Sequence, residues 1–301
     1  MNKSGFLYAL GAFCLWGFLP IFWKLLSDVP SLESLAHRVV WSMLLLVLML
    51  LVMGKTAWIR PTLRDKRKLW VTLLASIMLS INWGLFIYAI NIGEVLSASL
   101  GYYINPLLSV LIGVLFFRET LRPWQWVSIV AAASGVLWLT WSFGELPWIG
   151  LVLAASFGVY GALKKMAVLG PIEGLAIETS GVFLPALGYL IYLSWIGEGV
   201  FIAAGPFTSW MLASSAVATA VPLLLFAAAA QRIPLSMVGM MQYIAPTLQL
   251  LLGIFLYHEA FPAERLIGFA FIWLALIVFT SEGLFFRRKQ IQIGAAVVVK
   301  P

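Results

Sequence analysis

The amino-acid sequence predicts an all-α membrane protein with ten transmembrane helices, arranged as two inverted five-helix repeats. Three observations lead to this prediction. Of the 301 residues, 62% are hydrophobic and 10% are charged, and the mean hydropathy is +1.01. Apolar stretches of about 20 residues, long enough to cross a bilayer core, recur along the whole chain. The two halves also match each other at a constant spacing, with Tyr103 corresponding to Tyr243.

The predicted spans follow one another with short connections. Those of the first half cover residues 5–27, 32–53, 69–91, 95–117 and 123–142. Those of the second half cover 148–169, 173–196, 209–229, 235–257 and 263–285. We interpret the first span as an uncleaved helix, because its apolar run carries Trp16, Pro20 and Trp23 and lacks a small-x-small cleavage site. The sequence therefore predicts one transmembrane domain over residues 1–286 and a cytoplasmic tail over 287–301.

The repeat is densest where residues 96–119 align with 236–259. Pro106 then corresponds to Pro246, and Glu119 to Glu259. Because each predicted repeat, 5–142 and 148–285, has five spans, the second copy enters the membrane from the opposite face. Inverted repeats of this kind are typical of secondary transporters whose binding site lies between the two copies.

The distribution of basic residues predicts the orientation. With the N-terminus in the cytoplasm, all but three of the 19 lysines and arginines fall on the inner side; the exceptions are Lys24, Arg38 and Arg265. This positive-inside bias accounts for the net charge of +7 without a nucleic-acid partner. We expect a multi-pass bacterial inner-membrane protein with both termini in the cytoplasm.

Motifs for other functions are missing from the sequence. Cys14 is the only cysteine, and the two histidines, His37 and His258, have no metal-ligand spacing, so neither a metal site nor a cofactor is expected. No nucleotide-binding or hydrolase motif occurs, and we predict that the chain is not an enzyme. No filter-like repeat suggests a channel. A non-transporting membrane sensor or assembly subunit stays open as the alternative function.

Longer strings identify a family. They are HRVVWS at 37–42, NWGLFIYAIN at 82–91, SASLGYYINPLL at 97–108, SFGVYGALKK at 156–165, VPLLLFAAAA at 221–230 and QYIAPTL at 242–248. Through them the chain resembles the EamA family of the drug/metabolite transporter superfamily, in particular its RarD branch, over essentially its whole length. The resemblance implies an inner-membrane permease that exports small organic compounds, and it leaves the substrate open. It also places Trp16, Trp23, Trp41 and Tyr160 on inner helices, where they are candidates for an aromatic lining.

Charged groups inside the spans are the main candidates for a binding site. Arg38 and His37 lie about two turns into the second span, where a charge is costly unless it faces protein or water. Arg38 is either a partner for a substrate carboxylate or part of a structural ion pair. Glu178 occupies the position equivalent to Arg38 in the second half, and we predict that the two pair near the pseudo-two-fold axis. The alternative is a silent Glu178 near the headgroups. Proton coupling stays open and would need His37 or Glu178.

Polar and aromatic residues inside other spans complete the predicted site. Asn82, with Trp83 and Tyr88 nearby, suits a polar and partly aromatic solute, or else bonds two packed helices. The repeated cluster adds Tyr102, Tyr103, Gln242 and Tyr243. Pro106 and Pro246 interrupt helix hydrogen bonding in mid-span, which predicts kinks that serve either gating or packing. We therefore expect a carrier in the lipid bilayer that moves a small molecule by alternating access.

Overall fold

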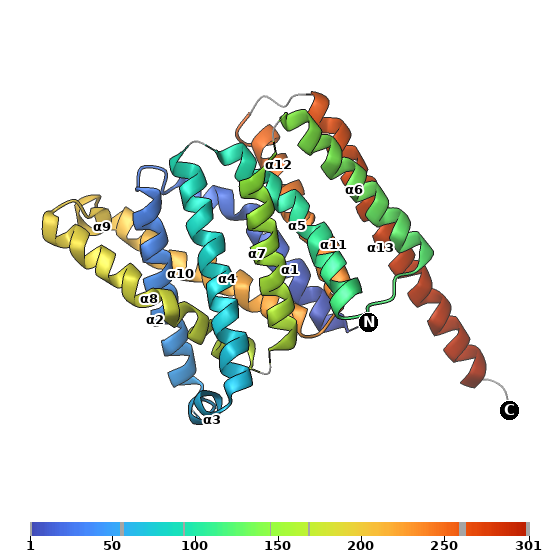
Figure 1. Cartoon of the computed structure of the whole chain (residues 1–301), viewed down its shortest axis with the longest axis horizontal. Helices are drawn as coiled ribbons and strands as arrows, with labels where there is room; N and C mark the ends of the chain where they lie inside the picture. The colour runs from blue at the N-terminus through green and yellow to red at the C-terminus, as the bar shows by residue number, and fades with distance from the viewer. Residues whose placement is uncertain are drawn as a thin grey trace.

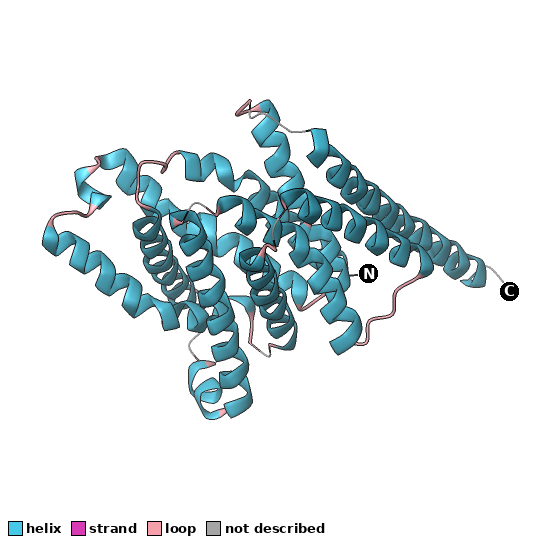
Figure 2. Cartoon of the chain, turned by 45° about the horizontal axis from the view of Figure 1, so that its top comes forward, coloured by secondary structure: helices cyan, strands magenta, loops and turns pink. Residues whose placement is uncertain are grey.

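The computed structural model describes residues 2–54, 57–92, 94–144, 146–167, 169–258 and 263–298, and within these ranges every regular element is a helix. Figures 1 and 2 show the helices as one bundle. The first half contains α1 (Lys3–Lys24), α2 (Ser31–Val52), α3 (Ile59–Arg64), α4 (Lys66–Asn91), α5 (Val95–Phe116) and α6 (Pro123–Phe143). The second contains α7 (Trp148–Met166), α8 (Pro171–Ile196), α9 (Val200–Ala203), α10 (Pro206–Ala230), α11 (Leu235–Gln242), α12 (Ile244–Phe255) and α13 (Ala263–Val298).

Nine helical segments of the described chain are long and apolar enough to cross a membrane, with α11 and α12 together forming one of them, Leu235–Phe255. The all-helical membrane class is therefore confirmed. The predicted span over 123–142 coincides with α6, a helix of 21 residues that is not among the nine. A total of ten spans stays a prediction.

Local signals in the sequence fix several helix ends. The Asn2 side chain accepts a hydrogen bond from the Gly5 amide at 3.1 Å, which satisfies one of the free N–H groups at the start of α1. Gly144 ends α6 with a φ of 83°, and Gly197 ends α8 with a φ of 74°. Glycine adopts this left-handed conformation without the strain of a side chain.

Equivalent spans of the two halves pack on each other in three helix pairs: α2 on α8, α5 on α11, and α6 on α13. The α6–α13 pair runs side by side at the edge of the bundle in Figures 1 and 2. Other pairs also bring the halves together, among them α5 with α7, α1 with α10, and α4 with α7. The first span of each half thus packs on the third span of the other half.

Glycines permit the closest of these contacts. A side chain at Gly239 of α11 would lie 2.7 Å from the Pro106 carbonyl oxygen of α5. A side chain at Gly135 of α6 would lie 2.6 Å from the Gly268 carbonyl oxygen of α13. Small residues at such crossings let helix backbones approach in a membrane, where packing replaces the hydrophobic effect.

The two predicted kink prolines lie in different settings. Pro106 lies inside α5, which stays one helix from Val95 to Phe116. Pro246 lies in the first turn of α12, directly after the break between α11 and α12 at Tyr243. Proline has no N–H, so Pro246 removes the hydrogen bond that would otherwise reach the carbonyl of Gln242 across this break.

Candidate functional site

Arg38 is the centre of the candidate site. Its Nε donates a hydrogen bond to Oγ1 of Thr219 on α10 at 3.0 Å. Its guanidinium carbon lies 4.5 Å from the ring centroid of Trp23 on α1 and 5.5 Å from that of Trp83 on α4. Side chains from three other helices therefore contact this cation, and the negative faces of two indole rings favour its charge. Tyr102 on α5 lies within electrostatic range of it.

Arg38 has no carboxylate partner among the described residues. The ion pairs found there involve other side chains, and its only hydrogen bond in that part of the chain is to the neutral Thr219. A cation in a low-dielectric interior interacts strongly with any anion that reaches it. The planar guanidinium fork also matches the two oxygens of a carboxylate. This arrangement is suited to binding an anionic group.

The predicted pair of Arg38 with Glu178 is wrong in this structure, since Glu178 pairs with Lys164 instead. The Lys164 Nζ lies 2.8 Å from Oε1 of Glu178, and the Tyr160 hydroxyl donates to Oε2 at 3.1 Å. Lys164 is 1% exposed, Glu178 2% and Tyr160 0%, so Glu178 is not the unpaired residue that the alternative near the headgroups assumed. Tyr160 and Lys164 are one helical turn apart on α7 and therefore face the same side of that helix. Both side chains can reach the carboxylate of Glu178, and Lys164 compensates its charge.

Lys164 is the residue that sequence reasoning missed. The orientation predicted from the basic residues only counts it, with Lys165, on the inner side of the membrane. Two adjacent residues on a helix point about 100° apart, so Lys164 and Lys165 cannot both face the same surroundings. This difference in direction, together with a glutamate inside the next span, is the sequence signal that could have indicated a buried Lys164 paired with Glu178.

The ion pair bridges two helices that do not pack along each other. The close helix pairs of α7 are with α4 and α5, and those of α8 are with α2 and α4. Ser76 of α4 donates a hydrogen bond to the Glu178 carbonyl oxygen at 2.8 Å. Lys164 and Glu178 therefore join α7 to α8 through their side chains, beside α4.

Aromatic rings extend from the Arg38 site toward this pair. Trp16 lies on α1, two turns from Trp23, and its ring centroid is 5.8 Å from that of Phe157 on α7. Phe157 lies 5.6 Å from Tyr160, and Phe226 of α10 lies 6.0 Å from Tyr160. Trp16 and Tyr160 thus belong to an aromatic cluster that joins α1, α7 and α10, and their role in lining a binding site stays a prediction.

His37 points away from Arg38 and lies under α9. Its ring stacks on Phe201 at a centroid distance of 4.9 Å, and its Nε2 is 3.8 Å from Oε1 of Glu33. Glu33 in turn accepts a hydrogen bond from the Val200 amide at 2.8 Å. Trp41, one turn further along α2, also lies against Phe201. The structure therefore places His37 and Trp41 beside α9, apart from the Arg38 site.

Asn82 bonds two helices. Its amide nitrogen donates to the Leu153 carbonyl oxygen at 2.9 Å and to Oγ of Ser156 at 3.1 Å, both on α7. Asn82 therefore makes the contacts expected of an amide that links two packed helices, which was the alternative to a role in solute recognition. Tyr88, on the same helix, is 49% exposed.

Tyr103, Gln242 and Tyr243 lie where α5 crosses α11. Gln242 donates to Oγ of Ser109 at 3.1 Å, and the Tyr243 hydroxyl donates to the Tyr103 carbonyl oxygen at 3.1 Å. The Tyr103 ring contacts Phe269 of α13. The repeated cluster thus divides: Tyr102 lies near Arg38, and the others hold the two halves together.

Glu119 connects the halves at the end of α5. Its carboxylate accepts hydrogen bonds from the amides of Leu235 at 2.7 Å and Ser236 at 2.9 Å, and lies 3.3 Å from Nζ of Lys165. Burial alone would raise the pKa of Glu119, but the bonds from Ser236 and Leu235 and the charge of Lys165 lower it below its usual value. Glu119 thus caps α11, whereas the nearby Arg122 pairs with Glu282. Glu259 lies outside the described residues.

Comparisons with known proteins agree with the fold. A model of the EamA-like transporter family matches residues 3–141. The chain is 46% identical over 296 residues to Protein RarD of Streptomyces exfoliatus, covering 98% of this chain and 94% of that protein. It is 44% identical to the uncharacterized transporter YojE of Bacillus subtilis (strain 168), covering 96% and 97%. A solved structure titled "Crystal structure of protein" aligns with a TM-score of 0.69 at 18% identity, covering 92% of this chain and 97% of the other.

Proposed function

This chain belongs to the EamA-like transporter family and is a membrane transporter, and on that premise we propose that it exports a small organic solute whose anionic group binds Arg38. The observation that carries the proposal is the setting of Arg38, with one neutral hydrogen-bond partner, two indole rings and no carboxylate among its described neighbours. A carboxylate bound there would supply the missing countercharge.

We further propose alternating access between two inverted five-helix halves in the bacterial inner membrane, with both termini cytoplasmic. The packing supports the inversion, since α2 with α8, α5 with α11, and α6 with α13 each join equivalent spans. A pseudo-two-fold axis between the halves places each of these spans beside its own equivalent in the other half. The range of the family model, 3–141, supports the boundary of the first repeat, 5–142. Export is proposed from the family resemblance.

Proton coupling is part of the proposal, with Glu178 as the group that takes up the proton. Its carboxylate accepts a hydrogen bond from Tyr160, which lies in an aromatic cluster with Phe157 and Phe226. Protonation would release Lys164 and change the charge of the interior by one unit.

The test is transport by the purified protein in proteoliposomes and uptake into inside-out vesicles, with a panel of amino acids, aromatic metabolites and amphenicols. We expect concentrative uptake of an anionic or zwitterionic member in inside-out vesicles, and loss of that uptake in Arg38→Ala. A panel in which no compound moves above protein-free liposomes would favour the sensor or assembly subunit instead.

A further inference from the structure

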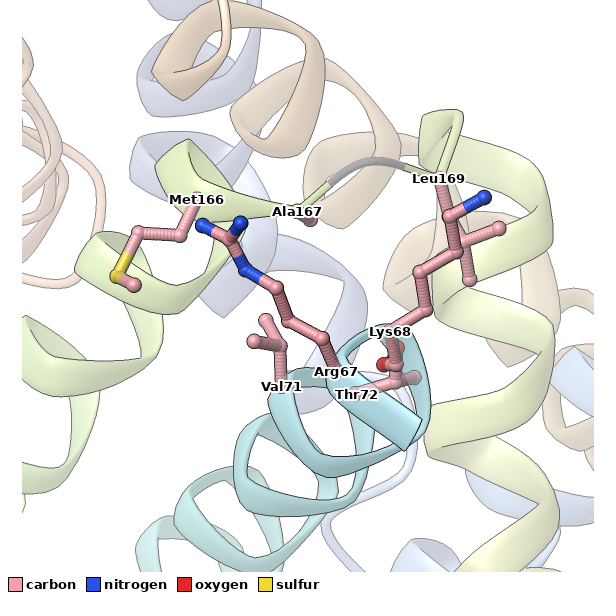
Figure 3. A pocket seen from close by; sticks show the side chains of 7 residues that line it. All are labelled: Arg67, Lys68, Val71, Thr72, Met166, Ala167 and Leu169. Atoms are coloured by element: carbon pink, nitrogen blue, oxygen red, sulfur yellow. The ribbon is translucent and has the colours of Figure 1, made fainter. Parts of the chain in front are cut away.

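A small pocket lies at the end of the bundle that carries α3. It is formed where the first turns of α4 face the connection from α7 to α8, and its lining includes Arg67, Lys68, Thr72, Met166 and Leu169. Figure 3 shows the Arg67 side chain extending from α4 toward Met166 and Ala167. Within the described chain, Arg67 makes no ion pair, while Lys68 lies 3.7 Å from Asp65. The pocket is therefore positively charged.

The Lys164–Glu178 pair lies directly beneath this pocket. Thr72 lines the pocket, and one helical turn further into α4, Ser76 donates its hydrogen bond to the Glu178 carbonyl oxygen. On the opposite wall, Met166 follows Lys164 by two residues. The next polar group along this side of α4 is Ser80, which donates to the Ser76 carbonyl oxygen. Pocket, ion pair and bundle interior thus follow one another along α4.

The ion pair is an unusual way to hold α7 and α8 together. Two apolar side chains of similar size would join these helices at equal or lower free energy, because a buried pair loses its hydration. A pair of charges, however, separates when one partner is neutralised or replaced by another ion. Such a contact is suited to closing and opening a passage.

The equivalent positions of the first half, which are both described, do not form such an ion pair. The first-half positions that correspond to Lys164 and Glu178 are Lys24 and Arg38. Both carry positive charge, and Lys24 lies over the ring of Tyr257 at 3.7 Å from its centroid. The ion pair is therefore specific to the end at which the pocket lies.

We propose that the pocket is the cytoplasmic entrance to the Arg38 site and that the Lys164–Glu178 pair closes it, so that an organic anion passes Arg67 and replaces Glu178 as the partner of Lys164. This inference rests on the proposed transport function, and it adds the route and its gate. The anion meets three cations in order, Arg67, Lys164 and Arg38, and the aromatic rings of Phe157 and Trp16 line the way between the last two.

The test measures accessibility and needs no transported solute. Cys14→Ala removes the only cysteine, and a single cysteine is placed in the pocket (Thr72→Cys) or beyond the ion pair (Ser80→Cys). Each protein is treated from either side of the membrane with the anionic reagent 2-sulfonatoethyl methanethiosulfonate or its trimethylammonium counterpart. The rate of thiol modification is followed by mass spectrometry of the intact protein.

We expect Ser80→Cys to react slowly from the cytoplasmic side and about tenfold faster when Glu178→Gln breaks the pair. Thr72→Cys, in front of the gate, should keep its rate. The reversed pair Lys164→Glu/Glu178→Lys keeps opposite charges and should keep Ser80→Cys slow, which separates gating from general loosening of the fold. Modification that is unaffected by Glu178→Gln, or that rises equally from the outer side, would overturn the proposal.

The charge of the entrance has its own matched control. At Thr72→Cys the anionic reagent should react faster than the cationic one, and Arg67→Gln should lower this ratio about fivefold, the effect of one nearby charge in partly screened water. Arg64→Gln, on α3 and outside the pocket lining, should leave the ratio unchanged. Equal ratios in Arg67→Gln and Arg64→Gln would contradict an anion entrance. If the labelling pattern appears but no solute is transported, the proposed function fails and the entrance stands; Arg38-dependent transport without the pattern has the opposite meaning.

Discussion

Glu119 and Lys165 form an ion pair across the two halves of the chain, with Oε1 and Nζ 3.3 Å apart. The same carboxylate receives the amides of Leu235 and Ser236 at the start of α11, and Lys165 also donates to the Ile233 carbonyl oxygen at 2.9 Å. One glutamate thus caps a helix and fixes the end of another, at the same end of the bundle as the Lys164–Glu178 pair.

Removing the charge of Glu119 should destabilise the protein. We expect Glu119→Gln to lower the free energy of unfolding by about 1–3 kcal/mol, because two amides and an ammonium lose a charged acceptor. The pKa of Glu119 is lowered in the fold, so its contribution is complete above the unfolded value of 4.5 and is lost as the pH falls further, through the folded pKa. The melting temperature in detergent should therefore converge with that of the wild type in acid. The exposed Glu198→Gln is the control, and an equal loss in both variants would refute the capping role.

Arg38 should be required for transport and dispensable for insertion. Arg38→Ala removes a buried cation, so membrane insertion should be unchanged or easier. Transport of an anionic solute should fall by about 10- to 100-fold, which corresponds to losing charged hydrogen bonds of roughly 1.5–3 kcal/mol. Arg38→Lys should recover only part of the rate, because an ammonium lacks the guanidinium fork. Full activity in Arg38→Ala, measured in vesicles with a verified solute, would disprove the assignment.

The two prolines should differ in their effects. Pro246→Ala restores an N–H beside the break between α11 and α12, so it should stabilise a continuous helix and slow transport more than it lowers expression. Pro106→Ala acts inside a helix that is already continuous, and we expect a smaller change. Initial rates per unit of inserted protein give the comparison. Unchanged rates in both variants would assign the prolines to packing.

Asn82 should matter for stability rather than for substrate choice. Asn82→Ala breaks two hydrogen bonds between α4 and α7, at a cost of about 1–2 kcal/mol in a membrane interior. Thermal unfolding should show this loss, while the apparent KM for the transported solute stays close to the wild-type value. A raised KM with normal stability would return Asn82 to the binding site.

The orientation predicted from basic residues is directly measurable. Reporter fusions after Leu63 and at the C-terminus should report the cytoplasm, and fusions near Glu145 and Gly199 should report the periplasm. With the N-terminus in the cytoplasm, a periplasmic C-terminus would require an odd total number of spans. Two repeats of five spans each cannot give an odd total, so this result would remove the inverted relation.

The sequence predicts helices far better than it predicts side-chain partners. The apolar runs predict each long helix. They do not predict the break at Tyr243, the short helices α3 and α9, or the continuation of α13 to Val298 beyond the predicted span over 263–285. The partner of Glu178 was wrong because the repeat argument compares equivalent positions, whereas an ion pair depends on which helices face each other. Neither the Lys164 ion pair nor the stacking of His37 on Phe201 of α9 follows from the spacing of the repeat, because that spacing does not specify which side chains face each other.

The ion pairs between helices are distributed unequally between the two ends of the bundle, so the proposed cytoplasmic gate differs chemically from the opposite end. Glu119–Lys165 and Lys164–Glu178 both lie on the proposed cytoplasmic side, and the position equivalent to Lys165 is the apolar Leu25. Cytoplasmic salt and acidity would therefore weaken the proposed gate, whereas Lys24, Leu25 and Arg38, the residues equivalent to Lys164, Lys165 and Glu178, form no ion pair within the described chain. A fold built from two similar halves can in this way respond to conditions on one side of the membrane only.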